Sequence, residues 1–123
     1  MFNLKKYALL VALLPVITLW TQTANAETLK TKNFLVKITR NCPEGYVTCD
    51  KVKYYGKNLK TGKSISLIGK TIHTTGADGI TPGRFLGYEF RNKNYLYRVT
   101  VDGTLLIYQG KKLILEEPGN LTY

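Results

Sequence analysis

The sequence is poor in the residues that build metal sites and common hydrolytic sites. It has one histidine, His73, and two cysteines, Cys42 and Cys49, in 123 residues. A structural zinc site takes four donors of this kind, and the chain has only three. The motifs G-x-S-x-G and H-E-x-x-H and the phosphate-binding P-loop are absent as well. We therefore expect no bound metal or cofactor, and we predict that the protein is not an enzyme.

Long hydrophobic runs are also scarce, and the one present lies at the N-terminus. Lys5 and Lys6 precede an apolar run over residues 7–20, and a polar stretch then ends in Ala24-Asn25-Ala26. This pattern predicts a signal peptide, residues 1–26, cleaved between Ala26 and Glu27. The run is shorter than the ~20 residues that cross a bilayer. We expect residues 27–123 to form a single small domain, periplasmic or secreted, with no transmembrane segment.

The two cysteines are interpreted in the light of that compartment. Cys42 and Cys49 are separated by six residues, among them Pro43 and Gly45, so this segment can turn back on itself. Secreted proteins mature where thiols oxidise, so the pair is predicted to form a disulfide worth about 2.5 kcal/mol. The spacing differs from the C-x-x-C of redox centres. Free thiols and pairing between two chains are the alternatives.

Helical periodicity is absent after the leader, whereas alternation of apolar and polar residues is frequent. It predicts strands over residues 33–39, 46–55, 63–73, 84–91, 94–101, 104–109 and 111–117. The Asp102-Gly103 pair between two of these runs is a strong hairpin signal, typical of a turn in which both residues have positive φ. We therefore expect an all-β fold, a small antiparallel barrel or sandwich of six to seven strands, with a C-terminal meander.

Residues 74–83 are the longest irregular stretch. The segment 77–83 reads ADGITPG and has no strand character, since Asp78-Gly79 and Pro82-Gly83 both mark turns. Loops of this kind often carry binding or catalytic residues.

Three segments, CPEGYVTCDKVKYYG, TGKSISLIGKTIHTT and ADGITPGRFLGYEF, carry a resemblance to a known group. The chain resembles small exported bacterial proteins of the Fels-type prophage protein group, over about residues 42–117. The resemblance implies a stand-alone exported domain of a Gram-negative bacterium, and it implies no activity or site. In that group's pattern Gly76 and Gly83 would be cysteines, so the resemblance implies, as a hypothesis, that a second short-loop disulfide was lost here as a pair.

Charge is the strongest functional signal in the sequence. There are 18 basic and 8 acidic residues, and removal of Lys5 and Lys6 with the leader leaves a net charge of about +8. Basic residues alternate with tyrosines, which suits a surface for an anionic envelope component or an acidic protein. The plainer interpretation is that the lysines guard strand edges and the tyrosines pack across strands. The predicted binding residues are Lys51, Lys53, Tyr55, Arg84, Arg91 and Arg98.

Two other functions stay open. The loop 74–83 could block the cleft of an envelope-acting enzyme, as an inhibitor or immunity-like protein does. A small hydrolase could use His73 as its base, with Asp50 or Asp78 to orient it and Ser64, Ser66 or Thr74 as nucleophile. We do not expect nucleic acid as the partner, and the sequence does not fix an oligomeric state.

Overall fold

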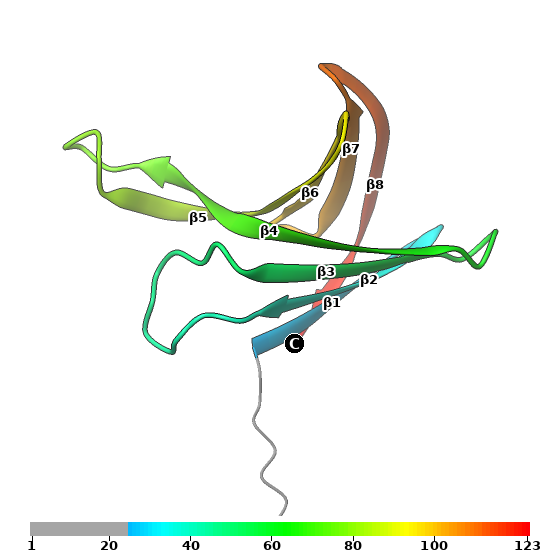
Figure 1. Ribbon diagram of the computed structural model, residues 1–123, viewed down its shortest axis with the longest axis horizontal. Coiled ribbons are helices and arrows are strands. Elements are labelled where there is room, and N and C mark those ends of the chain that lie inside the picture. Colours follow the sequence, from blue (N-terminus) through cyan, green and yellow to red (C-terminus); the bar gives the residue numbers. More distant parts are fainter. Residues whose placement is uncertain (1–24) are drawn as a thin grey trace, which may run out of the picture.

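The computed structural model describes residues 25–123, which form a closed antiparallel barrel with its eight strands in sequence order (Figure 1). Pairing of β1 with both β2 and β8 closes the barrel. Most of the predicted signal peptide lies outside the described residues. The strands are β1 (Asn25–Thr31), β2 (Phe34–Arg40), β3 (Val52–Asn58), β4 (Ser64–Thr75), β5 (Pro82–Asn92), β6 (Tyr95–Thr100), β7 (Thr104–Gln109) and β8 (Lys112–Thr122).

The predicted all-β class is confirmed, but the number of strands was wrong. Strand β1 was missed because only Leu29 among its inward-facing residues is strongly apolar, while Glu27 and Thr31 take the neighbouring inward positions. The expected strand over residues 46–55 was also wrong in its first half. Residues 41–51 form a loop, and β3 begins at Val52. Within residues 25–123, no helix is long and apolar enough to span a bilayer.

The C-terminal meander is confirmed, with a difference in one turn. Asp102-Gly103 does lie between β6 and β7, but only Gly103 has positive φ, at 91°. Its N–H donates to the carbonyl oxygen of Thr100. The link is thus three residues long with a glycine in the left-handed region, which is another common way to join antiparallel strands.

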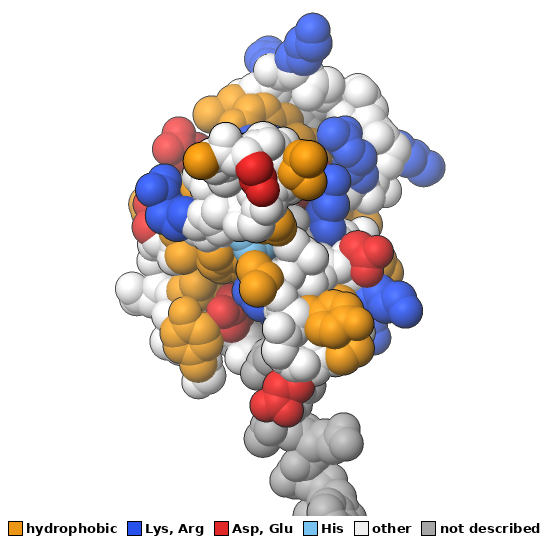
Figure 2. Space-filling view, turned by 90° about the vertical axis from the view of Figure 1, so that its left-hand side faces the viewer, with side chains coloured by type: hydrophobic (Ala, Val, Ile, Leu, Met, Phe, Trp, Pro, Cys, Tyr) orange, Lys and Arg blue, Asp and Glu red, His pale blue; other side chains and the backbone are white. Residues whose placement is uncertain are grey.

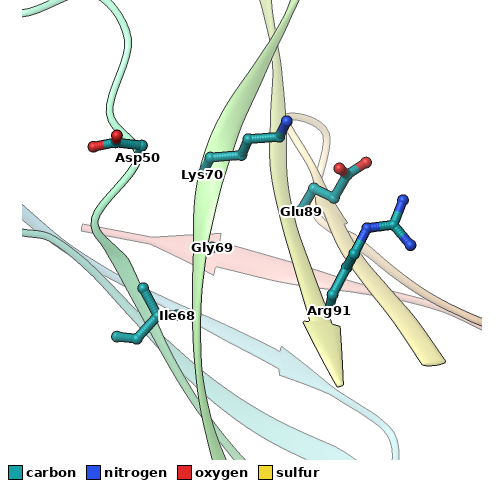
Figure 3. Close-up of a pocket in the computed structure, with 6 residues that line it drawn as sticks. All are labelled: Asp50, Ile68, Gly69, Lys70, Glu89 and Arg91. Carbon is teal, nitrogen blue, oxygen red and sulfur yellow. The ribbon is translucent and has the colours of Figure 1, made fainter. Parts of the chain in front are cut away.

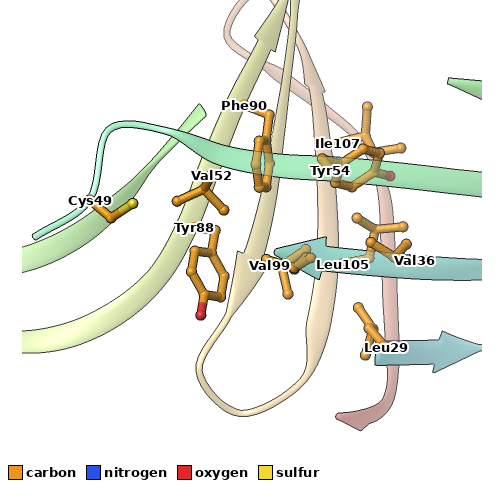
Figure 4. Packing of buried hydrophobic residues seen from close by; sticks show 11 residues of the cluster. Leu29, Val36, Cys49, Val52, Tyr54, Tyr88, Phe90, Val99, Leu105 and Ile107 are labelled. Carbon is orange, nitrogen blue, oxygen red and sulfur yellow. The ribbon is translucent and has the colours of Figure 1, made fainter. Parts of the chain in front are cut away.

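The interior of the barrel is filled by alternate residues of each strand. In β3, for example, Val52 and Tyr54 are buried whereas Lys53 and Tyr55 are exposed. Tyr54 contacts the rings of Phe90 and Tyr97, with centroids 4.9 and 5.5 Å apart, and these aromatic contacts join β3 to β5 and β6. Figure 4 shows the cluster. Its buried members are Leu29, Val36, Ile38, Cys49, Val52, Tyr54, Tyr88, Phe90, Val99, Leu105 and Ile107.

An up-and-down barrel has two distinct ends, and here they differ. The loop end carries the loop 41–51, the loop 76–81 and the turn 101–103, while the hairpin end carries the turns 32–33, 59–63, 93–94 and 110–111. At the loop end, Cys42 and Cys49 form the predicted disulfide, with Cα atoms 5.8 Å apart. Two hydrogen bonds between Cys49 and Thr71 tie this disulfide loop (residues 41–51) to β4.

Candidate functional site

The barrel presents a basic face on the outer side of β2 to β5. Sequential pairing aligns the outward side chains of these strands, so that Tyr55 lies opposite both Lys37 and Ser66, and Lys53 lies opposite Ile68. We use the term basic face for Lys37, Lys51, Lys53, Tyr55, Ile68, Lys70 and Arg91, all of which are exposed. Two acids lie beside it, Asp50 and Glu89.

A shallow hollow of about 330 Å³ lies across β4 and β5 within this face (Figure 3). It is lined by Asp50, Ile68, Gly69, Lys70, Glu89 and Arg91. In the close-up Lys70 and Arg91 lie on either side of Glu89. The apolar side chain of Ile68 is 60% exposed here, and Tyr55 is 42% exposed on the neighbouring strand. The hollow therefore offers cationic groups and an apolar contact in one place.

The structure brings together four of the six residues predicted from the sequence to bind. Lys53, Tyr55 and Arg91 lie on strands of the basic face, and Lys51, directly before β3, lines a neighbouring hollow together with Lys70. Sequence reasoning missed Lys37, Ile68 and Lys70, although each occupies an outward position of a predicted strand. The missing information was the register between strands, which decides which outward side chains become neighbours.

Arg98 is held by an ion pair at the edge of this face. Its Nη2 lies 3.2 Å from Oε2 of Glu89, whose side chain is only 12% exposed. The guanidinium carbon also lies 5.8 Å from the ring centroid of Tyr108, and Nε is buried without a partner among the described residues. Arg98 thus neutralises Glu89, whereas no salt bridge among the described residues holds Lys70 or Arg91.

Arg84 lies apart from the basic face. It belongs to the first residues of β5, near the loop end, and its backbone N–H donates to Thr74 Oγ1 at 2.7 Å. Glu89 is five residues further along the same strand, a distance of about 16 Å in extended chain. Arg84 therefore lies beside the loop 76–81 and not at the hollow.

The loop 76–81 is organised by one carboxylate. Asp78 Oδ1 accepts hydrogen bonds from the backbone N–H groups of Ile80 and Thr81, at 2.9 and 2.8 Å, and Oδ2 accepts one from the Thr81 hydroxyl. The bond from the Thr81 hydroxyl, followed by the two backbone bonds, lowers the pKa of Asp78 from 3.8 to about 2. The loop holds the Ile80 side chain in solvent, where it is 86% exposed.

Further apolar side chains lie at the same end of the barrel. On the disulfide loop Tyr46 and Val47 are each about two-thirds exposed, and Val101 in the turn 101–103 is half exposed. Figure 2 looks onto this side of the molecule and shows separate apolar patches around the single histidine. The loop end is thus the more apolar of the two candidate surfaces.

A polar cluster lies inside the barrel at the loop end, and sequence reasoning did not find it. Arg40 donates from Nε to the Tyr88 hydroxyl at 3.1 Å, and its guanidinium carbon lies 5.0 Å from the Phe85 ring centroid. Burial raises the pKa of Tyr88 to about 12, although the bond from Arg40 opposes the shift. Oε1 of Glu27 is buried nearby without a partner among the described residues. These contacts fix the interior at this end.

The groups that a hydrolase would need do not gather around His73. Its Nε2 lies 3.1 Å from Thr71 Oγ1, which already accepts the N–H of Cys49. Asp78 bonds within its own loop, and Thr74 Oγ1 accepts the N–H of Arg84. Ser64 and Ser66 are exposed further along β4, toward the hairpin end. No hydrogen bond among the described residues therefore links His73 to a candidate nucleophile or carboxylate.

Comparison of the chain with protein-family models, with curated proteins and with solved structures found no match. The resemblance to the Fels-type prophage protein group therefore stays a prediction, and the functional argument rests on the geometry above.

Proposed function

We propose that this is an exported, non-enzymatic binding protein that contacts an anionic envelope component or an acidic protein through the basic face. Export rests on the N-terminal signal pattern, and the disulfide between Cys42 and Cys49 is compatible with it. The binding role rests on one observation, the cross-strand register that places Lys37, Lys53 and Lys70 on one outer surface.

The balance of charge on this surface favours an anionic ligand. Five of the seven residues of the basic face are cationic, and of its two acidic neighbours Glu89 is already paired with Arg98. Clustered like charges raise the local concentration of counter-charged partners and speed encounter. The exposed parts of Tyr55 and Ile68 add apolar contact once a partner has docked.

A charge-reversal experiment tests the proposal. The double variant Lys53→Glu, Lys70→Glu is compared with Lys111→Glu, Lys112→Glu, which makes the same change in net charge at the β7–β8 turn. The probes are vesicles that contain phosphatidylglycerol, vesicles of phosphatidylcholine alone, and poly-glutamate. At about 1 kcal/mol per lysine near an anionic surface, loss of the two lysines and their replacement by glutamates should weaken binding to an anionic probe by at least about thirtyfold.

The control variant should lose only a few-fold, through the general field of the molecule. Equal losses in the two variants would show that net charge, and not the basic face, governs binding. Failure of the wild-type protein to bind either anionic probe at low salt would contradict the proposal as a whole.

The loop 76–81 supports a second candidate, an inhibitor or immunity-like protein. Its shape is preset by Asp78, and its apex presents Ile80 to solvent. A preorganised loop with an apolar tip loses little entropy when it enters a cleft. Binding of the loop to the cleft of a target enzyme should persist in 0.5 M salt. It should fail in Ile80→Asp, Asp78→Ala or Arg84→Ala. The double variant Lys53→Glu, Lys70→Glu should still bind.

A further inference from the structure

The hairpin end of the barrel opens into an apolar cavity of about 350 Å³. This volume falls within the range of small-molecule pockets, and the mouth of a β-barrel is one of the places where such pockets occur. The lining residues come from β2, β3, β4, β6, β7 and the turn 59–63. They are Phe34, Tyr54, Gly56, Asn58, Thr61, Lys63, Ser64, Ile65, Tyr97 and Ile107.

The floor of the cavity is the Tyr54 ring, which can lie across the inner side of β3 because residue 56 is a glycine. Gly56 follows Tyr54 on the inner side of the strand, and the Tyr54 ring lies over it. Figure 4 shows Tyr54 and Ile107 from this region of the core. Above that floor the walls are apolar, formed by Phe34, Ile65 and Tyr97. An apolar chain placed here would be shielded from water by these walls, except on the side that faces solvent.

The rim has the opposite character. Lys63 is the only charged residue among those that line the cavity. Asn58 accepts the backbone N–H groups of Lys60 and Thr61 with Oδ1, which leaves its amide nitrogen as a donor. Ser64 adds a hydroxyl beside them. The rim thus offers one cation and neutral donors, which suits a single negative charge.

We propose that the barrel mouth binds a small unbranched aliphatic carboxylate, with its chain among Phe34, Ile65 and Ile107 and its carboxylate at Lys63. The volume corresponds to roughly a dozen groups the size of a water molecule, too little for the two long chains of a membrane phospholipid. This site is separate from the basic face and does not depend on the role proposed for it.

The test is a calorimetric titration of the full domain with carboxylates from butanoate to dodecanoate. Affinity should rise about fourfold per methylene, as expected for burial of apolar chain, until the cavity is full at about decanoate, and should then level off. Octan-1-ol should bind about tenfold more weakly than octanoate. Absence of measurable binding by decanoate at millimolar concentration, or equal affinity for the acid and the alcohol, would overturn the proposal.

Three variants locate the ligand. Ile65→Trp should fill the cavity and abolish binding of octanoate and octan-1-ol together, with folding checked by circular dichroism. Lys63→Glu should remove the preference for the acid and leave the alcohol unaffected. Lys60→Glu, the same change three residues away on the same turn, should change the affinity for octanoate less than threefold. Unchanged octanoate affinity in both Ile65→Trp and Lys63→Glu would place the ligand elsewhere and overturn the assignment.

Discussion

The ring of Tyr54 lies so close above Gly56 that a Cβ atom at residue 56 would be 2.6 Å from the Tyr54 hydroxyl. Tyr54 is 1% exposed and packs against Phe90 and Tyr97, so its ring has little freedom to move away except toward the barrel mouth. A glycine at this position therefore allows the Tyr54 ring to pack where it does, at the floor of the cavity.

The first prediction concerns this contact. Gly56→Ala should lower the free energy of unfolding by about 1–3 kcal/mol, because an extra methyl group in a well-packed core forces side chains out of their rotamers. Urea denaturation measures the change. The same cost should appear in a Tyr54→Phe background, where the ring remains, and most of it should vanish in Tyr54→Leu. An equal cost in all three backgrounds would show that the Tyr54 ring is not what Gly56 accommodates.

The second prediction concerns the disulfide. Replacing Cys42 by Ser and Cys49 by Ala should destabilise the domain by about 2.5 kcal/mol, through the entropy that the unfolded chain regains. Dithiothreitol should have a similar effect on the wild-type protein and none on the variant. Because Thr71 ties Cys49 to β4, the barrel itself should stay folded. Equal stability of the oxidised protein and the variant would contradict this account.

The third prediction concerns the pH dependence of the loop 76–81. The pKa of Asp78 is lowered from 3.8 to about 2 by the bonds from Thr81 and Ile80. The ionised Asp78 should therefore keep the loop fully ordered above pH 3.8. The loop should become disordered as the pH falls through 2 and Asp78 is protonated. Amide exchange at Ile80 and Thr81 measures it.

Two variants serve as controls for that titration. Asp78→Asn keeps an acceptor oxygen but has no proton to gain, so its exchange should not change over this interval beyond the intrinsic pH effect. Asp78→Ala should expose both amides at every pH. A wild-type carboxyl that titrates near 3.8 by NMR would show that these bonds do not hold the loop in solution.

The fourth prediction concerns the ion pair between Glu89 and Arg98. Glu89→Gln should destabilise the barrel by roughly 1–3 kcal/mol, since it leaves the guanidinium of Arg98 without its charged partner in a half-buried place. The same change removes a negative charge beside Lys70 and Arg91, so it should tighten binding to anionic vesicles. Thermal denaturation and vesicle titration check the two effects. Weaker vesicle binding by Glu89→Gln would mean that the hollow does not face the anion.

Much of the fold could be predicted from local patterns. The alternation in β2, β6 and β7 and the turn at Asp102-Gly103 predicted the meander, because each strand in it pairs with its neighbour in sequence. Strand β1 was not predicted because its inward residues Glu27 and Thr31 are polar and break the apolar alternation. Residues 46–51 look like a strand in sequence, but the bridge from Cys42 to Cys49 holds most of this stretch in a loop.

The candidate site was less accessible from the sequence. Lys53 and Tyr55 could be named because they alternate along one strand, whereas Lys37 and Lys70 joined them only through the register across three strand pairs. The barrel mouth could not be foreseen, because a cavity depends on how the inward side chains of several strands pack against one another. Gly56 carries no such information until its strand is placed in the barrel.

The salt dependence of vesicle binding tests the central claim most directly. The dissociation constant of the wild-type domain for phosphatidylglycerol vesicles is measured from about 0.05 to 0.5 M sodium chloride, an interval over which exposed charges become screened. Binding through the basic face predicts an affinity that falls at least tenfold, and a clearly smaller fall for Lys53→Glu, Lys70→Glu. A wild-type affinity that stays constant over this interval would contradict the claim.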